Sequence, residues 1–165
     1  PSRDWLNLVL EVKPAQATLV PDAAEAITSN AGWDTIARQK ELQIIISELK
    51  AAGIRTSIFV DPDLSMVEAA LATGTDRIEL YTESYATHFQ INKHDAIEPF
   101  IQASEKANSI GLGINAGHDL NLENLHFFQT ELSYLDEVSI GHALISDALY
   151  YGLENAVQMY LSKLS

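Results

Sequence analysis

Five short apolar segments alternate with longer amphipathic stretches, and this alternation constrains the fold more than any other feature of the sequence. Each segment is four or five residues long, and most contain β-branched or aromatic residues, as expected of strands covered on both faces. The segments are residues 17–20, 56–60, 77–81, 111–114 and 137–140. Such strands are typical of a parallel sheet.

The stretches between these segments carry apolar residues at helical spacing. We expect helices over residues 5–12, 34–52, 63–73, 95–110, 120–132 and 145–164. Gly53, Gly74 and Gly111 follow three of these stretches, and glycine commonly ends a helix. The pattern therefore predicts repeated βα units joined by right-handed crossovers.

Two architectures fit this alternation. No Pro-, Gly- or Ser-rich linker divides the 165 residues, so we predict a single domain over residues 1–165. Its class is α/β with a parallel sheet, either a doubly wound sheet or part of a (β/α)₈ (TIM) barrel. A complete barrel usually needs about 250 residues. The chain is therefore either a complete five-stranded sheet or the C-terminal five-eighths of a barrel.

The composition excludes several classes of partner and site. Ten Lys plus Arg against 23 Asp plus Glu give a net charge of −13, which would repel nucleic acid and anionic membranes. The sequence has no apolar run long enough to span a membrane and no signal-peptide pattern, so we expect a soluble, cytoplasmic protein. There are no cysteines, which rules out disulfides and thiolate metal sites.

Functional residues of parallel α/β folds gather at the C-terminal ends of the strands. The segments that follow the predicted strands are therefore the first places in which to expect them. Gly117-His118 and Gly141-His142 repeat one dipeptide after two successive strands. Glycine lets backbone amides approach a ligand, and a helix beginning nearby points unpaired N–H groups at an anion. Gly141 and His142 therefore indicate a phosphate site, which would offset the unfavourable net charge locally.

His118 is the leading candidate for proton transfer, because an imidazole can give and take protons near neutral pH. The alternative is a histidine that only shapes a turn. Glu79, within the third strand, is either a buried structural carboxylate or a catalytic one. Asp61 and Asp63 read as a turn and a helix N-cap.

The remaining polar positions are weaker candidates. Thr28 and Ser29 lie in the long loop after the first strand and could bind a ligand hydroxyl. His88, His94 and His126 are expected on the surface. No metal-binding motif and no nucleotide-binding glycine motif is present, so we expect no metal and no nucleotide cofactor.

Taken in order, the strand-end motifs resemble the C-terminal part of the pyridoxine 5'-phosphate synthase family. They are "ATLVPD", "ITSNAGWD", "GIRTSIFVDPD", "RIELYTESYA", "GLGINAGHDLNLENL" and "VSIGHALISDALYYGLENAV". The resemblance implies a (β/α)₈ barrel that condenses 1-deoxy-D-xylulose 5-phosphate with 3-amino-2-oxopropyl phosphate, yielding pyridoxine 5'-phosphate, phosphate and water. It also implies a homo-oligomeric transferase of vitamin B6 biosynthesis, with phosphorylated small-molecule substrates and no cofactor.

The resemblance carries roles onto individual residues. His118 matches the family's proton donor. Gly141 and His142 match contacts to the phosphate of the amino-ketone substrate, and Thr28 matches a contact to the deoxyxylulose phosphate. Repeated proton transfers during imine formation, dehydration and ring closure suit a histidine at a strand end.

The sequence departs from the family in two respects. The residue after the histidine, often a glycine that contacts phosphate, is Asp119. Its carboxylate would repel phosphate, so we expect its backbone amide to bind while its side chain caps a helix beginning near Leu120. The family's first three strands, which carry other essential residues, have no counterpart here. The five units alone are therefore expected to be inactive.

Two other functions remain open from the sequence. One is another phosphate-binding barrel, such as an isomerase or aldolase, that shares only the final phosphate loops. The other is a non-catalytic anion-binding or assembly module. Product formation from the two phosphorylated substrates would separate the synthase from both.

Overall fold

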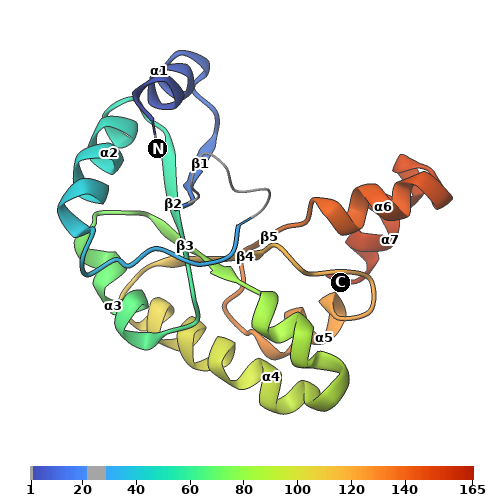
Figure 1. Cartoon of the computed structure of the whole chain (residues 1–165). Helices are drawn as coiled ribbons and strands as arrows, with labels where there is room; N and C mark the ends of the chain where they lie inside the picture. The colour runs from blue at the N-terminus through green and yellow to red at the C-terminus, as the bar shows by residue number, and fades with distance from the viewer. Residues whose placement is uncertain (1, 22–28) are drawn as a thin grey trace.

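The computed structural model describes residues 2–21 and 29–165, and its centre is a five-stranded parallel sheet (Figure 1). The strands are β1 (Gln16–Leu19), β2 (Arg55–Val60), β3 (Arg77–Tyr81), β4 (Gly113–Gly117) and β5 (Glu137–Ser139). The helices are α1 (Arg3–Val12), α2 (Gln39–Ala51), α3 (Leu64–Ala72), α4 (Glu83–Ser109), α5 (Leu125–Glu131), α6 (His142–Tyr151) and α7 (Leu153–Ser162).

The strand order decides between the two predicted architectures. The spatial order is β1-β2-β3-β4-β5, and every neighbouring pair is parallel. Each strand therefore lies next to the one before it, always on the same side. Because the crossovers are right-handed, this order places all the connecting helices on one face of the sheet, as in a barrel. A doubly wound sheet would reverse direction and cover both faces. In Figure 1, helices α1 to α4 form an arc around the outside of the curled sheet.

The curvature of the sheet is evident from side chains that meet across its inner face. Glu79 Oε2 on β3 accepts hydrogen bonds from Thr18 Oγ1 on β1 (3.2 Å) and Ser139 Oγ on β5 (3.4 Å). In a flat sheet β1 and β5 would lie about 19 Å apart, since neighbouring strands are about 4.8 Å apart. One carboxylate can join both strands only because the sheet curls into a half-barrel.

A second polar layer crosses the inner face nearer the N-terminal ends of the strands. Arg55 on β2 pairs with Glu137 on β5 at 2.6 Å. Arg77 pairs with Asp136 at 2.7 Å and donates a hydrogen bond to Asn115 at 3.1 Å. The inner face is thus largely polar, and the alternation of side chains along each strand places the apolar residues outside.

The hydrophobic core lies between the outer face of the sheet and the helices. The strands contribute side chains that are almost completely buried: Leu19, Ile58, Val60, Ile78, Leu80, Ile114 and Ala116.

Among the described residues, no helix is both long enough and apolar enough to cross a membrane.

The predicted helix ends at Gly53, Gly74 and Gly111 are confirmed. Each of these glycines has a positive φ, between +79° and +84°. After α4, the Leu112 amide donates to the Ala107 carbonyl and the Gly111 amide donates to Asn108, which is a Schellman motif.

This motif also explains why the predicted bounds of the fourth strand were wrong, although the strand itself is confirmed. Gly111 and Leu112 belong to the helix end, so β4 begins at Gly113 and continues through Gly117. The residues before His118 are therefore strand and not turn.

Several helix predictions also need correction, and α2, for example, begins at Gln39 and not at residue 34. α4 begins twelve residues earlier than predicted, at Glu83, and breaks at Asn92, whose φ of −154° and ψ of 98° are not helical. The predicted C-terminal helix is two helices, because Gly152 has a φ of +80° between α6 and α7.

The segment that leads from the loop after β1 into α2 packs directly on the end of β2. Trp33 donates from its backbone amide to Phe59 O (2.8 Å) and from its indole to Leu19 O (3.0 Å). Gly32 lies so close that an added Cβ would be 2.3 Å from the amide nitrogen of Asp61. Because the neighbour is backbone, it cannot move aside as a flexible side chain would.

We expect Gly32→Ala to destabilise the protein by about 2 kcal/mol, within the range observed when a well-packed site is overfilled. Urea unfolding would measure the loss. Ala31→Ser, which adds one heavy atom at the exposed neighbouring position, is the control and should change stability little. Equal stability of the two variants would contradict the close packing of this segment.

Candidate active site

The C-terminal ends of β3, β4 and β5 form a continuous rim. The strand register pairs Tyr81 with Gly117, and Gly117 with Ser139. His118 follows β4 directly, and its backbone amide donates to Ser139 O at 3.4 Å. The predicted residues His118, Gly141 and His142 therefore follow neighbouring strands at the same edge of the sheet.

His118 lies against two aromatic rings and one carboxylate. Its imidazole packs edge-on against Tyr81, with ring centroids 5.1 Å apart, and lies 6.4 Å from the ring of Phe59. Its Nδ1 is 2.6 Å from Asp119 Oδ2. A carboxylate at Nδ1 favours the tautomer that carries hydrogen there.

The contact between Asp119 and His118 corrects the prediction for the Asp119 side chain. The carboxylate caps no helix; it binds His118 instead. The residue that accepts from backbone amides before α5 is Asn121, which binds the amides of Glu123 and Asn124. α5 begins at Leu125, after the N-cap residue Asn124, and not near Leu120.

Gly117 leaves room for the buried carboxylate of Glu79. A Cβ on Gly117 would lie 2.8 Å from Glu79 Oε1 and 2.8 Å from Ser139 O. A glycine at a strand end predicts an opening through which backbone amides can approach a ligand. At Gly117 this space is instead filled by a side chain of the neighbouring strand.

Glu79 faces the inside of the half-barrel, which answers the question that the sequence left open about its direction. Burial raises the pKa of Glu79, and the negative charge of Glu137 raises it further. Hydrogen bonds from Thr18 and Ser139, and the nearby His118, lower the pKa of Glu79, but by less than the other two influences raise it. A carboxyl group with a raised pKa beside a candidate proton donor is a common feature of active sites.

Gly141 and His142 form the beginning of α6. Gly141 is the N-cap residue, no side chain caps this end of the helix, and Ile145 N makes the first helical bond to Gly141 O. Space around the Gly141 Cα is open, since an added Cβ would meet nothing within 4 Å. The first amides of α6 are thus oriented as they are at anion-binding helix ends.

Of the two aspartates that follow β2, Asp63 has the capping role predicted for it, and the Asp61 side chain has a structural role that was not predicted. Asp63 is the N-cap of α3, and hydrogen bonds from Ser65 and Met66 lower its pKa. Asp61 accepts from the amide of Gly32 at 3.1 Å and so holds the segment after the β1 loop.

The loop after β1 is only partly described. The predicted phosphate contact Thr28 lies outside the described residues. Its neighbour Ser29 reaches the rim, where its carbonyl accepts a hydrogen bond from Tyr81 at 3.2 Å.

Several residues of the rim had no individual signal in the sequence. Phe59, Tyr81, Thr82, Thr18 and Ser139 surround His118 or Glu79. The period of two along each strand predicts which side chains share a face, but the curvature that brings different strands together is not visible in that pattern.

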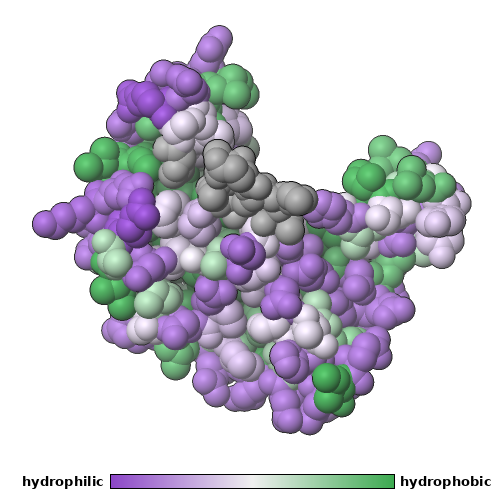
Figure 2. Space-filling view, in the orientation of Figure 1, coloured by the Kyte–Doolittle hydropathy of each residue, from purple (hydrophilic) through white to green (hydrophobic). Residues whose placement is uncertain are grey.

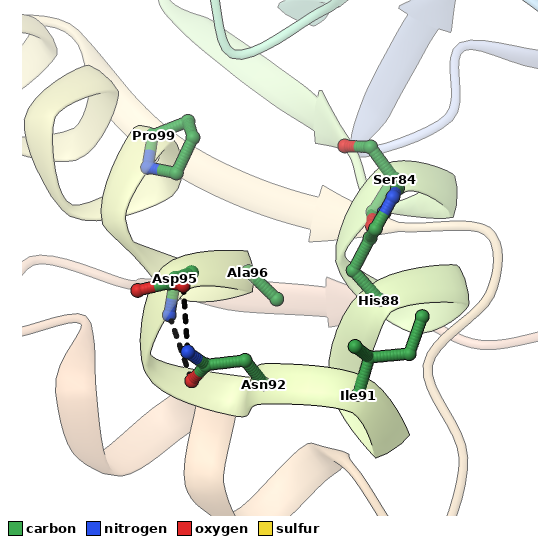
Figure 3. A pocket seen from close by; sticks show the side chains of 7 residues that line it. All are labelled: Ser84, His88, Ile91, Asn92, Asp95, Ala96 and Pro99. Atoms are coloured by element: carbon green, nitrogen blue, oxygen red, sulfur yellow. Dashed lines mark hydrogen bonds between the residues drawn. The ribbon is translucent and has the colours of Figure 1, made fainter.

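A cavity lies inside the bend of α4 (Figure 3). It has a volume of about 240 Å³, and Figure 3 shows Asn92 and Asp95 hydrogen-bonded at the bend, with His88 on the other arm. His88, His94 and His126 are exposed on helices, as predicted. Within residues 2–21 and 29–165, no three acidic or histidine side chains are grouped to hold a metal.

Comparison with known proteins identifies the relatives of this chain. The family described as "Pyridoxal phosphate biosynthesis protein PdxJ" matches residues 1–165. The chain belongs to the PdxJ family. It is 60% identical to the pyridoxine 5'-phosphate synthase of Cytophaga hutchinsonii and 59% identical to that of Flavobacterium johnsoniae. Each alignment covers 99% of this chain and 69% of the relative.

A solved structure supports the fold of this PdxJ chain. The HMG-CoA lyase of Brucella melitensis aligns with a TM-score of 0.57 over 99% of this chain and 60% of that protein. At 17% sequence identity this similarity concerns the fold alone.

The raised pKa of Glu79 predicts a pH-dependent stability for this PdxJ protein. The folded state retains a proton that the unfolded chain loses, so the stabilisation is present at low pH and declines as pH rises from the ordinary glutamate pKa through the folded-state pKa. Glu79→Gln keeps a neutral side chain of the same shape and should reduce this decline. Urea unfolding at roughly pH 4 to 8 would test it.

The control is Glu105→Gln, which removes an exposed glutamate from α4. This variant should retain the pH slope of the unmodified protein. A Glu79→Gln variant with that same slope would show that Glu79 is not protonated in the folded state.

Proposed function

We propose that this chain forms the larger part of a pyridoxine 5'-phosphate synthase. The enzyme would condense 1-deoxy-D-xylulose 5-phosphate with 3-amino-2-oxopropyl phosphate to pyridoxine 5'-phosphate, phosphate and water. The observation that carries the proposal is the 59–60% identity to synthases over 99% of the chain. The rim around His118 provides a place for the chemistry.

The half-barrel has the features expected of a barrel that further units complete. In the described part of the chain, the outer edges of β1 and β5 pair with no other strand. α6 buries no residue, and apolar side chains gather on the arm formed by α6 and α7 (Figure 2). The exposed ones include Ile145, Leu149, Tyr150 and Leu153. We propose that the additional length of the relatives supplies three βα units that close the barrel and cover this surface.

His118 is the proposed proton donor of the reaction. The condensation needs protons delivered to leaving oxygen atoms, and an imidazole can supply them near neutral pH. With Nδ1 bound to Asp119, Nε2 is the atom that would transfer the proton. Glu79, whose pKa is raised by burial, is a second group that can carry a proton beside this rim.

The phosphate groups require local positive potential, because the chain has a net charge of −13. We propose that the first amides of α6, with Gly141 and His142, bind the phosphate of the amino-ketone substrate. Thr28 is the proposed contact to the other phosphorylated substrate. The residues that bind phosphate would thus come from loops at the rim that also carries His118.

The remaining expectations about the complete enzyme stay predictions. Imine formation, dehydration and ring closure need proton transfers that side chains can provide, so we expect no cofactor. We also expect a cytoplasmic homo-oligomer with small-molecule substrates and no nucleic-acid or membrane partner.

We expect the complete polypeptide to form pyridoxine 5'-phosphate, and His118→Ala to lower kcat by about 100-fold or more, the usual contribution of a positioned acid or base. Product fluorescence or chromatography would measure turnover. The control is His126→Ala, which removes an exposed histidine of α5 and should retain activity. Wild-type turnover in His118→Ala would refute the proton-donor role, and absence of product in the unmodified enzyme would favour another barrel enzyme or an anion-binding module.

The proposed phosphate contact at Asp119 makes a separate prediction. Its amide already donates to Thr82 Oγ1 at 3.3 Å, and its carboxylate would lie beside the phosphate. Asp119→Asn should lower KM for the amino-ketone phosphate roughly two- to fivefold, because one repulsive charge is removed, and should also lower kcat, because the carboxylate bound to His118 Nδ1 is lost. Steady-state kinetics would measure this change.

Glu105→Gln makes the same change of net charge at the opposite end of the sheet, on the last turns of α4 that lead into β4. It should leave KM unchanged. An unchanged KM in Asp119→Asn would place the phosphate away from Asp119.

A further inference from the structure

The backbone of His118 has a conformation that a histidine seldom adopts. Its φ is +104°, in the region that favours glycine, and only Lys13 shares a positive φ among the described non-glycine residues. Such a conformation persists where the surrounding structure holds it in place. The question is which groups hold it at the residue proposed to transfer protons.

One buried residue binds the peptide groups on both sides of His118. Thr82, the residue directly after β3, is completely buried. Its amide and its hydroxyl both donate to the carbonyl of Gly117, at 3.2 and 2.9 Å. The same hydroxyl accepts from the amide of Asp119 at 3.3 Å. The two peptide groups next to His118 are thus fixed to a single side chain of the neighbouring strand.

The hydroxyl of Thr82 makes these bonds in place of capping its own helix. Thr82 is the N-cap residue of α4, where a threonine hydroxyl usually accepts from the amides of the first helical turn. Here the hydroxyl makes no capping bond. It is turned away from its own helix and toward the end of β4.

We propose that Thr82 is a positioning residue for His118. It acts through the backbone, by holding residue 118 at positive φ, and does not need to touch the substrates. The inference rests on the proposed function, because it assigns to His118 the transfer of a proton. Its consequence is that the imidazole stays between the Tyr81 ring and the Asp119 carboxylate when no substrate is bound.

Both capacities of the hydroxyl are needed, since it donates to one peptide group and accepts from the other. Valine has the shape of threonine and can do neither. Serine can do both. Comparing Thr82→Val with Thr82→Ser therefore distinguishes the effect of the two hydrogen bonds from the effect of side-chain packing.

The experiment compares Thr82→Val, Thr82→Ser and a matched control in the complete enzyme. The control is Thr73→Val. Thr73 is also buried, and its hydroxyl also donates to a carbonyl, of Ala70 (2.7 Å), and accepts from an amide, of Thr75 (3.4 Å). It lies after α3, before β3 begins, at the end of the sheet opposite His118. Thermal unfolding, kcat, KM for both substrates and the crystal structures are measured for each variant.

We expect Thr82→Val to lower kcat on the order of 10- to 100-fold, because small displacements of a reacting group have effects of this size. KM for both substrates should change less than about twofold, and Thr82→Ser should restore most of the turnover. Thr73→Val should lose stability to a similar extent and retain kcat. In the crystal structure of Thr82→Val, His118 should have left its positive φ.

Three results would overturn the inference: wild-type kcat in Thr82→Val, a loss of kcat equal to that of Thr73→Val, or no recovery in Thr82→Ser. If Thr82→Val does not fold, Thr82→Ala is compared with Thr82→Ser by the same criteria. If the unmodified enzyme forms no product, the proposed function fails, and the crystal structures still decide the role of Thr82. A retained φ at His118 without the hydroxyl would then refute it.

Discussion

The buried carboxylate of Glu79 is the interaction on which the arrangement of the inner face depends. It accepts hydrogen bonds from Thr18 on β1 and Ser139 on β5, the two outermost strands. It therefore connects two strands that would lie far apart in a flat sheet. Burial raises its pKa, and its position requires that residue 117 have no side chain. The glycine in the "NAGHD" sequence is therefore explained by packing within the half-barrel.

The same region concentrates unfavourable local features that the fold compensates. A carboxyl group is buried, His118 has a positive φ, and Thr82 leaves the first turn of α4 without a side-chain cap. Each feature costs stability by itself, and together they place an imidazole at a defined point of the rim. Local rules of sequence and structure are commonly broken at functional sites for this reason.

Much of the fold could be predicted from the alternation of short apolar strands and amphipathic helices, since burial imposes both periods on the sequence. The helix ends at Gly53, Gly74 and Gly111 were also predictable, because glycine alone adopts a positive φ without steric cost. The bounds of β4 were not, since Gly111 and Leu112 form bonds to the preceding helix. The break at Asn92 divides α4 into two helices. The spacing of apolar residues in the sequence does not show whether the part before this break is a helix or a loop.

By itself, the sequence determined the class of fold, the family and the position of His118 at the end of a strand, because these follow from local periodicity and from the order of motifs. Only the tertiary structure decided the strand order, the inward direction of Glu79 and the contacts of Thr82 and Asp119 with the surroundings of His118. The contacts of Glu79 depend on the curvature of the sheet, which brings together residues about sixty positions apart, and those of Thr82 depend on the pairing of β3 with β4. No local pattern encodes such distances, since they arise when the helices pack on one face and the polar side chains close across the other.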